Sequence, residues 1–199
     1  MLDLCTGSGC ISLLLCSTWT PGSTLAVGID TSLEALQLAH DNALACASVL
    51  SPNIPSTPTS HTKNIFIPLH ADVRHTDTLT DLLTTWRPFH IITANPPYIP
   101  RDQYHKLDRS VKDFEDQTAL LGDPPGSPDR DGLTFYFHIA NLVARGHVLA
   151  KDGWLVLEVG DGQAQPVQNI VRSIPGIINT EIWTDPWGRE RVVVARNHD

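Results

Sequence analysis

The fold is decided by the stretch Leu2-Asp3-Leu4-Cys5-Thr6-Gly7-Ser8-Gly9-Cys10-Ile11. A short apolar strand here runs into a glycine-bearing turn and then into an apolar helix. Glycine lets the backbone come close to a ligand, and the start of a helix offers free N–H groups. The third glycine of the dinucleotide fingerprint is absent, because Ser12 stands in its place. The turn alone is therefore weak support for a nucleotide site, and later strands must supply the rest.

Two further strands lead to carboxylates. The strand predicted over 25–29 ends at Asp30, where a carboxylate is placed to accept both hydroxyls of a ribose. The strand predicted over 65–70 leads to Asp72, which can accept from the exocyclic amine of an adenine while Val73 packs nearby. Taken singly, a carboxylate at such a place is more often a helix cap or a solvated turn.

The fourth strand, predicted over 89–94, is followed by Asn95-Pro96-Pro97-Tyr98. Open α/β sheets place ligands at the carboxyl ends of their strands. The Asn95 side-chain oxygen and the proline carbonyls are acceptors, because proline has no N–H to offer, and with a flat ring they form a clamp for a planar –NH₂ group. The alternative is an Asn-Pro turn that only closes the strand. The glycine turn, two carboxylates and the clamp, in order at βα-unit spacing, favour the clamp.

Strand–helix alternation along the chain predicts an α/β fold. We expect a Rossmann-like, doubly wound sheet of seven strands, mainly parallel, with helices on both faces. Residues 184–190 are too few for a parallel crossover, so the last-but-one or last strand should be antiparallel. We expect one domain over 1–199, with a mobile insertion at 51–63 and a long loop at 99–130 beside the ligand. The strands are predicted near 1–4, 25–29, 65–70, 89–94, 154–159, 177–183 and 191–196, and the helices near 10–18, 32–47, 77–86, 132–149 and 162–173.

Composition fits a globular domain and narrows the choice of partner. Hydrophobic residues make up 41% of the chain, and its formal net charge is −8. Duplex-binding proteins carry a basic stripe, whereas no Lys/Arg cluster occurs here, so direct binding of nucleic acid is not expected. No apolar run is long enough to cross a membrane, and no signal or transit peptide is read. The nine histidines and four cysteines lack metal-ligand spacing, so we expect no metal.

The glycine turn, Asp30, Asp72 and the clamp together resemble the S-adenosylmethionine-dependent methyltransferases of the Rossmann-like class. More specifically, the chain resembles the HemK/PrmC-type methyltransferases, which modify the glutamine of the Gly-Gly-Gln loop of peptide-chain release factors. The resemblance covers nearly the whole chain. Asn-Pro-Pro-Tyr alone is shared with adenine-modifying enzymes, so specificity rests on the full set. Further stretches that look like the family's are Val111–Leu120, Asp131–Leu133, Trp154–Gly160 and Gly188–Val194.

The resemblance implies a protein-(glutamine-N5) methyltransferase, with 1–199 as its catalytic domain and 99–130 as a substrate-side loop. It implies S-adenosyl-L-methionine as cofactor and a peptide-chain release factor as protein partner, hence a role in translation termination. Phe114 lines the glutamine pocket by this analogy, with a packed aromatic as the alternative. The implied catalytic residues are Asn95, Pro96 and Tyr98; the cofactor residues are Thr6, Gly7, Ser8, Gly9, Asp30, Asp72, Val73 and Asn95; the substrate residues are Asn95, Pro96, Pro97, Tyr98 and Phe114.

Two other functions stay open at this point. One is an adenine-specific DNA or RNA methyltransferase that uses the same clamp. The other is a truncated, non-catalytic module that binds cofactor or a partner, because family members carry a helical domain before the first strand and Met1 already lies on that strand. The expected location is mitochondrial or cytoplasmic, since nothing in the chain chooses between them.

Overall fold

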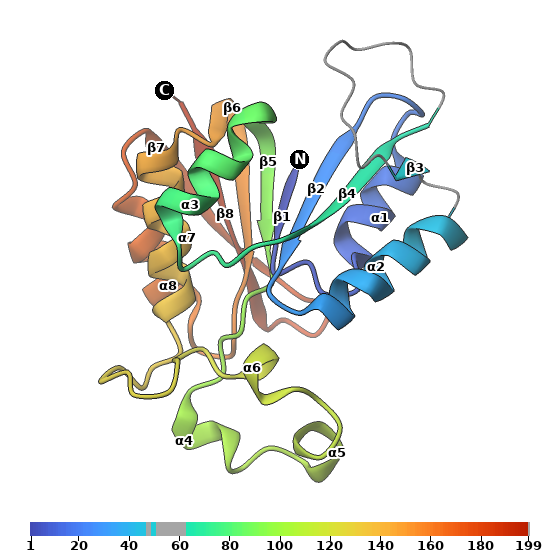
Figure 1. Ribbon diagram of the computed structural model, residues 1–199. Helices are drawn as coiled ribbons and strands as arrows, with labels where there is room; N and C mark the ends of the chain where they lie inside the picture. Colours follow the sequence, from blue (N-terminus) through green and yellow to red (C-terminus); the bar gives the residue numbers. More distant parts are fainter. Residues whose placement is uncertain (47–48, 51–62, 199) are drawn as a thin grey trace. The chain divides into compact units, whose positions relative to one another are not determined.

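A computed structural model describes residues 1–46, 49–50 and 63–198 (Figure 1). The described chain divides into two compact units, one made of 1–72 and 91–94 and the other of 73–90 and 95–199. The predicted insertion at 51–63 lies outside the described residues except for Lys63. The prediction of one domain over 1–199 therefore stays a prediction.

The first unit contains the parallel part of the fold. Its strands run in the order β3-β4-β2-β1-β5, of which β5 contributes Ile91–Ala94, and every pair in this order is parallel. The helix α1 connects β1 to β2, and α2 connects β2 to β3 (Figure 1). The bounds are β1 Leu2–Leu4, α1 Cys10–Thr18, β2 Leu25–Asp30, α2 Leu33–Ala45, β3 Val49–Leu50, β4 Ile65–His70 and β5 Phe89–Ala94.

The core of this unit explains why one strand position must be glycine. Buried side chains from α1 and α2 pack against Ala26 of β2 and Phe66 of β4. A Cβ at Gly28 would lie 2.6 Å from the Phe66 ring, so only glycine lets that ring pack across β2. Both helices therefore pack on β2 and β4, and α1 begins at the end of the glycine turn.

The second unit contains an antiparallel set of strands with helices packed on it. The order is β6-β8-β7, with β8 antiparallel to both neighbours, as predicted for the end of the chain. Helix α8 contacts α7, β7 and β8, and α3 contacts α7. The bounds are α3 Thr76–Leu82, η1 Leu83–Thr85, α4 Arg101–Tyr104, α5 Arg109–Lys112, α6 Gln117–Leu120, α7 Thr134–Gly146, β6 Leu149–Glu158, α8 Ala164–Arg172, β7 Ile177–Thr184 and β8 Glu190–Asn197.

The predicted α/β, Rossmann-like fold class is confirmed, with three local differences. The two-residue strand β3 adds to the seven strands predicted. Strand β6 begins at Leu149, five residues before its predicted start near 154. The sequence misplaces it because Asp152-Gly153 is typical of a turn, whereas Asp152 takes φ 59° inside a continuing strand.

The third difference concerns the segment 99–130, which was predicted as one irregular loop. It contains three helices of four residues each, α4, α5 and α6 (Figure 1). Two of them start at aspartates whose carboxylates accept from a backbone N–H two residues later: Asp108 from Ser110 and Asp116 from Thr118, each at 2.8 Å. Helices this short show no hydrophobic period, so the sequence pattern does not predict them.

Candidate active site

The glycine turn between β1 and α1 needs its two glycines for different reasons. Gly7 and Gly9 both have positive φ, 54° and 78°, which side-chain-bearing residues rarely adopt. A Cβ at Gly9 would lie 3.2 Å from Ala39 Cβ, so this glycine lets α2 pack close to the turn. A Cβ at Gly7 would meet nothing within 4 Å among the described residues. Gly7 therefore leaves the backbone of the turn open to an approaching ligand.

Asp30 ends β2 and ties the glycine turn to the helix that follows. Its Oδ2 accepts from Gly7 N–H at 2.8 Å, and its Oδ1 accepts from Ser32 N–H at 2.9 Å. An ionised carboxylate has about four acceptor sites, so two remain on this half-buried group. Asp30 is thus held in one orientation and retains the capacity to bind two hydroxyls.

Asp72 lies at the same sheet edge as Asp30. Strands β2 and β4 are paired in parallel with Asp30 opposite His70, and the Asp30 carbonyl accepts from Ala71 N–H at 3.1 Å. Asp72 follows directly and is half-exposed. Its neighbour Val73 is buried and belongs to the second unit. Within the first unit, the structure therefore brings the glycine turn and both predicted carboxylates to one edge.

The remaining residues of the turn are fixed by side chains that sequence reasoning did not assign. The Ser8 carbonyl accepts from Asn42 Nδ2 at 3.0 Å, which links the turn to α2. Thr6 is buried, and its hydroxyl donates to Asp3 Oδ2 at 2.7 Å. These bonds hold the turn in place through residues of the first unit.

Asp3 is the main support of the first unit that the sequence reasoning missed. It is 1% exposed, and besides Thr6 it accepts from Ser12 Oγ at 3.0 Å and from Thr93 Oγ1 at 2.6 Å. Burial raises the pKa of Asp3, and the hydrogen bonds from the three hydroxyls oppose that rise without cancelling it. The signal in the sequence is an aspartate between two leucines on a buried strand.

The clamp residues Asn95–Tyr98 follow β5 in the chain and belong to the second unit. Asn95 is exposed, and among the described residues its amide has no hydrogen-bond partner. Pro96 and Pro97 are buried, so the backbone behind Asn95 is packed while its side chain stays available. This arrangement differs from that of a simple closing turn, in which the Asn side chain usually bonds to its own backbone.

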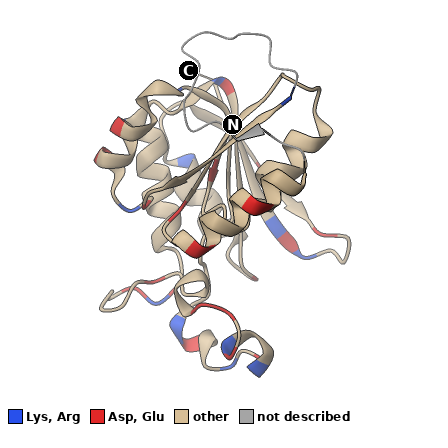
Figure 2. Cartoon of the chain, turned by 45° about the vertical axis from the view of Figure 1, so that its right-hand side comes forward, with Lys and Arg blue, Asp and Glu red and all other residues tan. Residues whose placement is uncertain are grey.

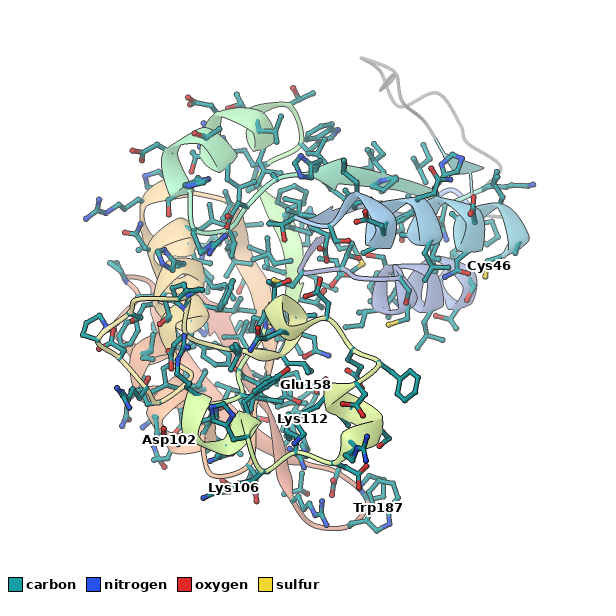
Figure 3. The ribbon with its side chains drawn as sticks, turned by 60° about the horizontal axis from the view of Figure 1, so that its bottom comes forward. Cys46, Asp102, Lys106, Lys112, Glu158 and Trp187 are labelled. Carbon is teal, nitrogen blue, oxygen red and sulfur yellow. The ribbon has the colours of Figure 1, made fainter. Side chains whose placement is uncertain are left out.

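Tyr98 is held at both ends by residues that come much later in the chain. Its hydroxyl donates to Glu158 Oε1 at 3.3 Å, and its carbonyl accepts from Gln163 Nε2 at 2.9 Å. Burial, followed by the negative charge of Glu158, raises the pKa of the Tyr98 phenol. The phenol therefore stays protonated near neutral pH and acts as a donor to Glu158. Figure 3 labels Glu158 at the carboxyl end of β6 and Lys112 on α5.

The structure places Phe114 apart from the packed residues of the second unit. Ile99 pairs with Leu121, so the segment that starts after the clamp returns to it before α7. Phe114 lies between α5 and α6 with 87% of its surface exposed. The alternative of a packed aromatic is therefore wrong, and its predicted role in a glutamine pocket stays a prediction.

Figure 2 shows lysine and arginine segments mixed with acidic ones in residues 1–46, 49–50 and 63–198, without a continuous basic stripe. None of the described helices combines the length and apolar character that a bilayer crossing requires. The same residues contain no group of three or more His, Cys, Asp or Glu side chains arranged to hold a metal ion.

Solved structures define the class of fold. A methyltransferase from Pyrococcus furiosus matches 100% of this chain and 74% of its own at a TM-score of 0.59 and 10% identity. An O-methyltransferase from Bacillus cereus, solved in complex with SAH, matches 98% of this chain and 72% of its own at a TM-score of 0.54 and 8% identity. At such identities the likeness shows the fold alone, which is that of the Rossmann-like methyltransferases.

Curated relatives narrow the similarity to one kind of methyltransferase. The release factor glutamine methyltransferase of Thermodesulfovibrio yellowstonii is 32% identical over 198 residues, 98% of this chain and 58% of the relative. That of Geobacter sulfurreducens is 33% identical over 196 residues, 98% of this chain and 57% of the relative. No protein-family model matches the chain. The resemblance inferred from the motifs is confirmed along nearly the whole chain, which spans less than two thirds of the length of these relatives.

Proposed function

We propose that this protein transfers a methyl group from S-adenosyl-L-methionine to the side-chain amide nitrogen of the glutamine in the Gly-Gly-Gln motif of a peptide-chain release factor. The observation that carries the proposal is the exposed, unpartnered Asn95 amide at the head of a clamp with a buried proline backbone. The names of the relatives support the same reaction. In this function residues 1–199 form one catalytic domain, and the protein acts in mitochondria or in the cytoplasm, as predicted from the sequence.

The first unit fits the cofactor that this reaction needs. The open face of Gly7 leaves room beside the turn formed by Thr6, Gly7, Ser8 and Gly9. The free acceptor sites of Asp30 suit the two hydroxyls of a ribose, and Asp72 suits an adenine amine beside Val73. The cofactor supplies an activated methyl group on a sulfonium sulfur.

The clamp residues act on the glutamine amide. An amide nitrogen is a poor nucleophile, because its lone pair is delocalised into the carbonyl, so it must be aligned with the methyl group. The Asn95 side-chain oxygen and the Pro96 carbonyl accept the two hydrogens of that nitrogen. Both acceptors bond more strongly as the nitrogen becomes positive, so they favour the transition state over the bound substrate. Alignment of this kind contributes on the order of 7–11 kcal/mol.

Tyr98 and Phe114 complete the proposed substrate side, together with Pro97. The Tyr98 ring packs on the plane of the amide. No strong general base is required, because the proton leaves after methyl transfer. The exposed Phe114 is available to the polypeptide that carries the glutamine.

The experiment that tests the proposal uses labelled S-adenosylmethionine and two versions of a release factor. One version carries Gly-Gly-Gln and the other carries Gly-Gly-Ala. We expect label on the first only, located by mass spectrometry on the glutamine side chain. Label on DNA or RNA in a parallel reaction, with none on either release factor, would reject the proposal and select the adenine reaction.

A further inference from the structure

The Asn-Pro-Pro-Tyr segment is fixed to the rest of the second unit through its last residue. Asn95 makes no hydrogen bond to any described residue, whereas Tyr98 is bonded through both its hydroxyl and its carbonyl. The backbone of the segment is therefore held at one end by β5, where Ala94 pairs with Leu4, and at the other end by the two bonds of Tyr98. The two prolines between Asn95 and Tyr98 stiffen this backbone, so a displacement of Tyr98 is transmitted to Asn95.

Gln163 bonds to three different parts of the second unit. Its Nε2 donates to the Tyr98 carbonyl at 2.9 Å and to the Asp131 carbonyl at 2.8 Å, and its Oε1 accepts from Gly160 N–H at 3.0 Å. All the hydrogen-bonding capacity of the amide donor is used, in a side chain that is only 7% exposed. Gln163 thus links the clamp to the turn after β6 and to the residues before α7.

Glu158 fixes the ring at the opposite end of Tyr98. Its carboxylate accepts from the phenol at 3.3 Å, and its own carbonyl accepts from Tyr136 at 2.8 Å. Two glycines press against the same residue: a Cβ at Gly160 would lie 2.9 Å from Tyr98 Cδ2, and a Cβ at Gly132 would overlap the Tyr98 carbonyl. Tyr98 is therefore in close contact on its ring and on its backbone, in addition to its two hydrogen bonds.

We propose that Glu158 and Gln163 are positioning residues that hold Tyr98 by its two ends and thereby set the orientation of Asn95. This inference rests on the proposed function, since the clamp must bind an amide for its orientation to affect a rate. In this proposal neither residue contacts the substrate. Each residue acts on kcat through Tyr98 alone. Mutating it should therefore no longer affect kcat once a second substitution has already removed its bond to Tyr98.

A double-mutant cycle of Glu158→Gln and Tyr98→Phe tests the ring contact. We expect Glu158→Gln to lower kcat by about 10-fold in the protein with Tyr98, because the acceptor of the phenol loses its charge. In the Tyr98→Phe background, the same change should lower kcat by less than about 2-fold, since no hydroxyl remains to be held. Equal losses in both backgrounds would overturn the role of Glu158.

The matched pair Gln163→Glu and Gln168→Glu tests the backbone contact. Gln168 lies in α8 and is 6% exposed, as buried as Gln163, but its bonds go to Gln165 and to the Thr180 carbonyl. Gln163→Glu replaces the amide donor with an acceptor facing two carbonyls, and we expect about a 10-fold lower kcat with unchanged affinity for S-adenosylhomocysteine. Similar losses of kcat in both variants would reject the positioning role. If Gln163→Glu does not fold, Gln163→Asn takes its place, because the shorter side chain cannot reach Tyr98.

The titration of Tyr98 separates this inference from the proposed function. In NMR spectra, the ring signal that Tyr98→Phe removes belongs to Tyr98, and its pKa is measured without any substrate. Glu158→Gln should lower that pKa toward the ordinary value of 10.0, whereas Glu181→Gln, on β7, should leave it unchanged. An unchanged Tyr98 pKa in Glu158→Gln would overturn the proposed role of Glu158 in holding Tyr98, even if the enzyme proves active. A shifted pKa with no methylation by the unaltered protein would reject the proposed function and keep the contact.

Discussion

The glycine turn and the Asn-Pro-Pro-Tyr clamp are positioned in opposite ways. The turn is held directly, because Thr6 bonds to Asp3, Gly7 to Asp30 and Ser8 to Asn42. The clamp makes its hydrogen bonds at its far end, through Tyr98, and the Asn95 side chain has no hydrogen-bond partner among the described residues. A site for a bound cofactor gains from being preformed, whereas acceptors that act on a reacting nitrogen must be left unsatisfied until the substrate arrives. We therefore expect mutations in the clamp to lower mainly turnover, and mutations at the turn to lower mainly the affinity for the cofactor.

Removing the clamp amide should have the largest effect. We expect Asn95→Ala to lower kcat by about 100- to 1000-fold, the loss typical of removing one preorganised group that acts on the transition state. Affinity for S-adenosylhomocysteine, measured by calorimetry, should stay within about 2-fold. Asn169→Ala, an exposed asparagine on α8, is the control and should leave both quantities unchanged. An equal fall in turnover and cofactor affinity would contradict the division of roles.

Removing the carboxylate beside the turn should reverse this pattern. We expect Asp30→Ala to weaken the binding of S-adenosylhomocysteine by roughly 1.5–3 kcal/mol, through the loss of charge-assisted hydrogen bonds. Turnover at saturating cofactor should fall much less. Asp30→Asn keeps one acceptor oxygen, so its affinity for S-adenosylhomocysteine should lie between that of the unaltered protein and that of Asp30→Ala. Unchanged affinity in Asp30→Ala would remove Asp30 from the cofactor site.

Asp3 should make the stability of the protein depend on pH in a direction opposite to that of a paired carboxylate. Its folded pKa lies above the ordinary value of 3.8, chiefly because of burial. The folded protein therefore binds this proton more tightly than the unfolded chain does. The contribution to the free energy of unfolding is complete below the ordinary pKa and is lost as pH rises through the raised value.

Asp3→Asn isolates that contribution, since it keeps the shape of the side chain without its titration. We expect the free energy of unfolding of the unaltered protein to fall relative to that of Asp3→Asn as pH rises above 3.8. Urea titrations at a series of pH values measure the difference. A difference that grows in the opposite direction would show that the three hydroxyls outweigh burial.

The exposed aromatic of the segment 99–130 should have the smallest effect. Phe114→Ala should change the free energy of unfolding by less than about 0.5 kcal/mol, because 87% of this residue is exposed. If Phe114 contacts the release factor, KM for that protein should rise several-fold while kcat holds. Phe137→Ala, another exposed phenylalanine, serves as the control on α7. An unchanged KM would remove Phe114 from the substrate residues.

Most of the fold was predictable from local pattern. The strands from β1 to β5, with the exception of β3, follow apolar runs, and their predicted limits agree with the structure to within one residue. The errors fall where local signals mislead or are too short. Asp152-Gly153 resembles a turn within β6, and the four-residue helices of 99–130 are set by single aspartate caps. Predicted site residues in the first unit were likewise local, since each lies at the end of a strand or within a few residues after it.

The sequence by itself determined the order of strand ends and the residue types that they carry, because period and turn chemistry are properties of neighbouring residues. Only the tertiary structure decided which polar groups are engaged and which are left free. Asp3 accepts hydrogen bonds from hydroxyls of residues up to 90 positions away in the sequence, and Gln163 donates one to Tyr98, which is 65 positions away. Such bonds depend on burial and on the pairing of distant strands and turns, so no local pattern contains them.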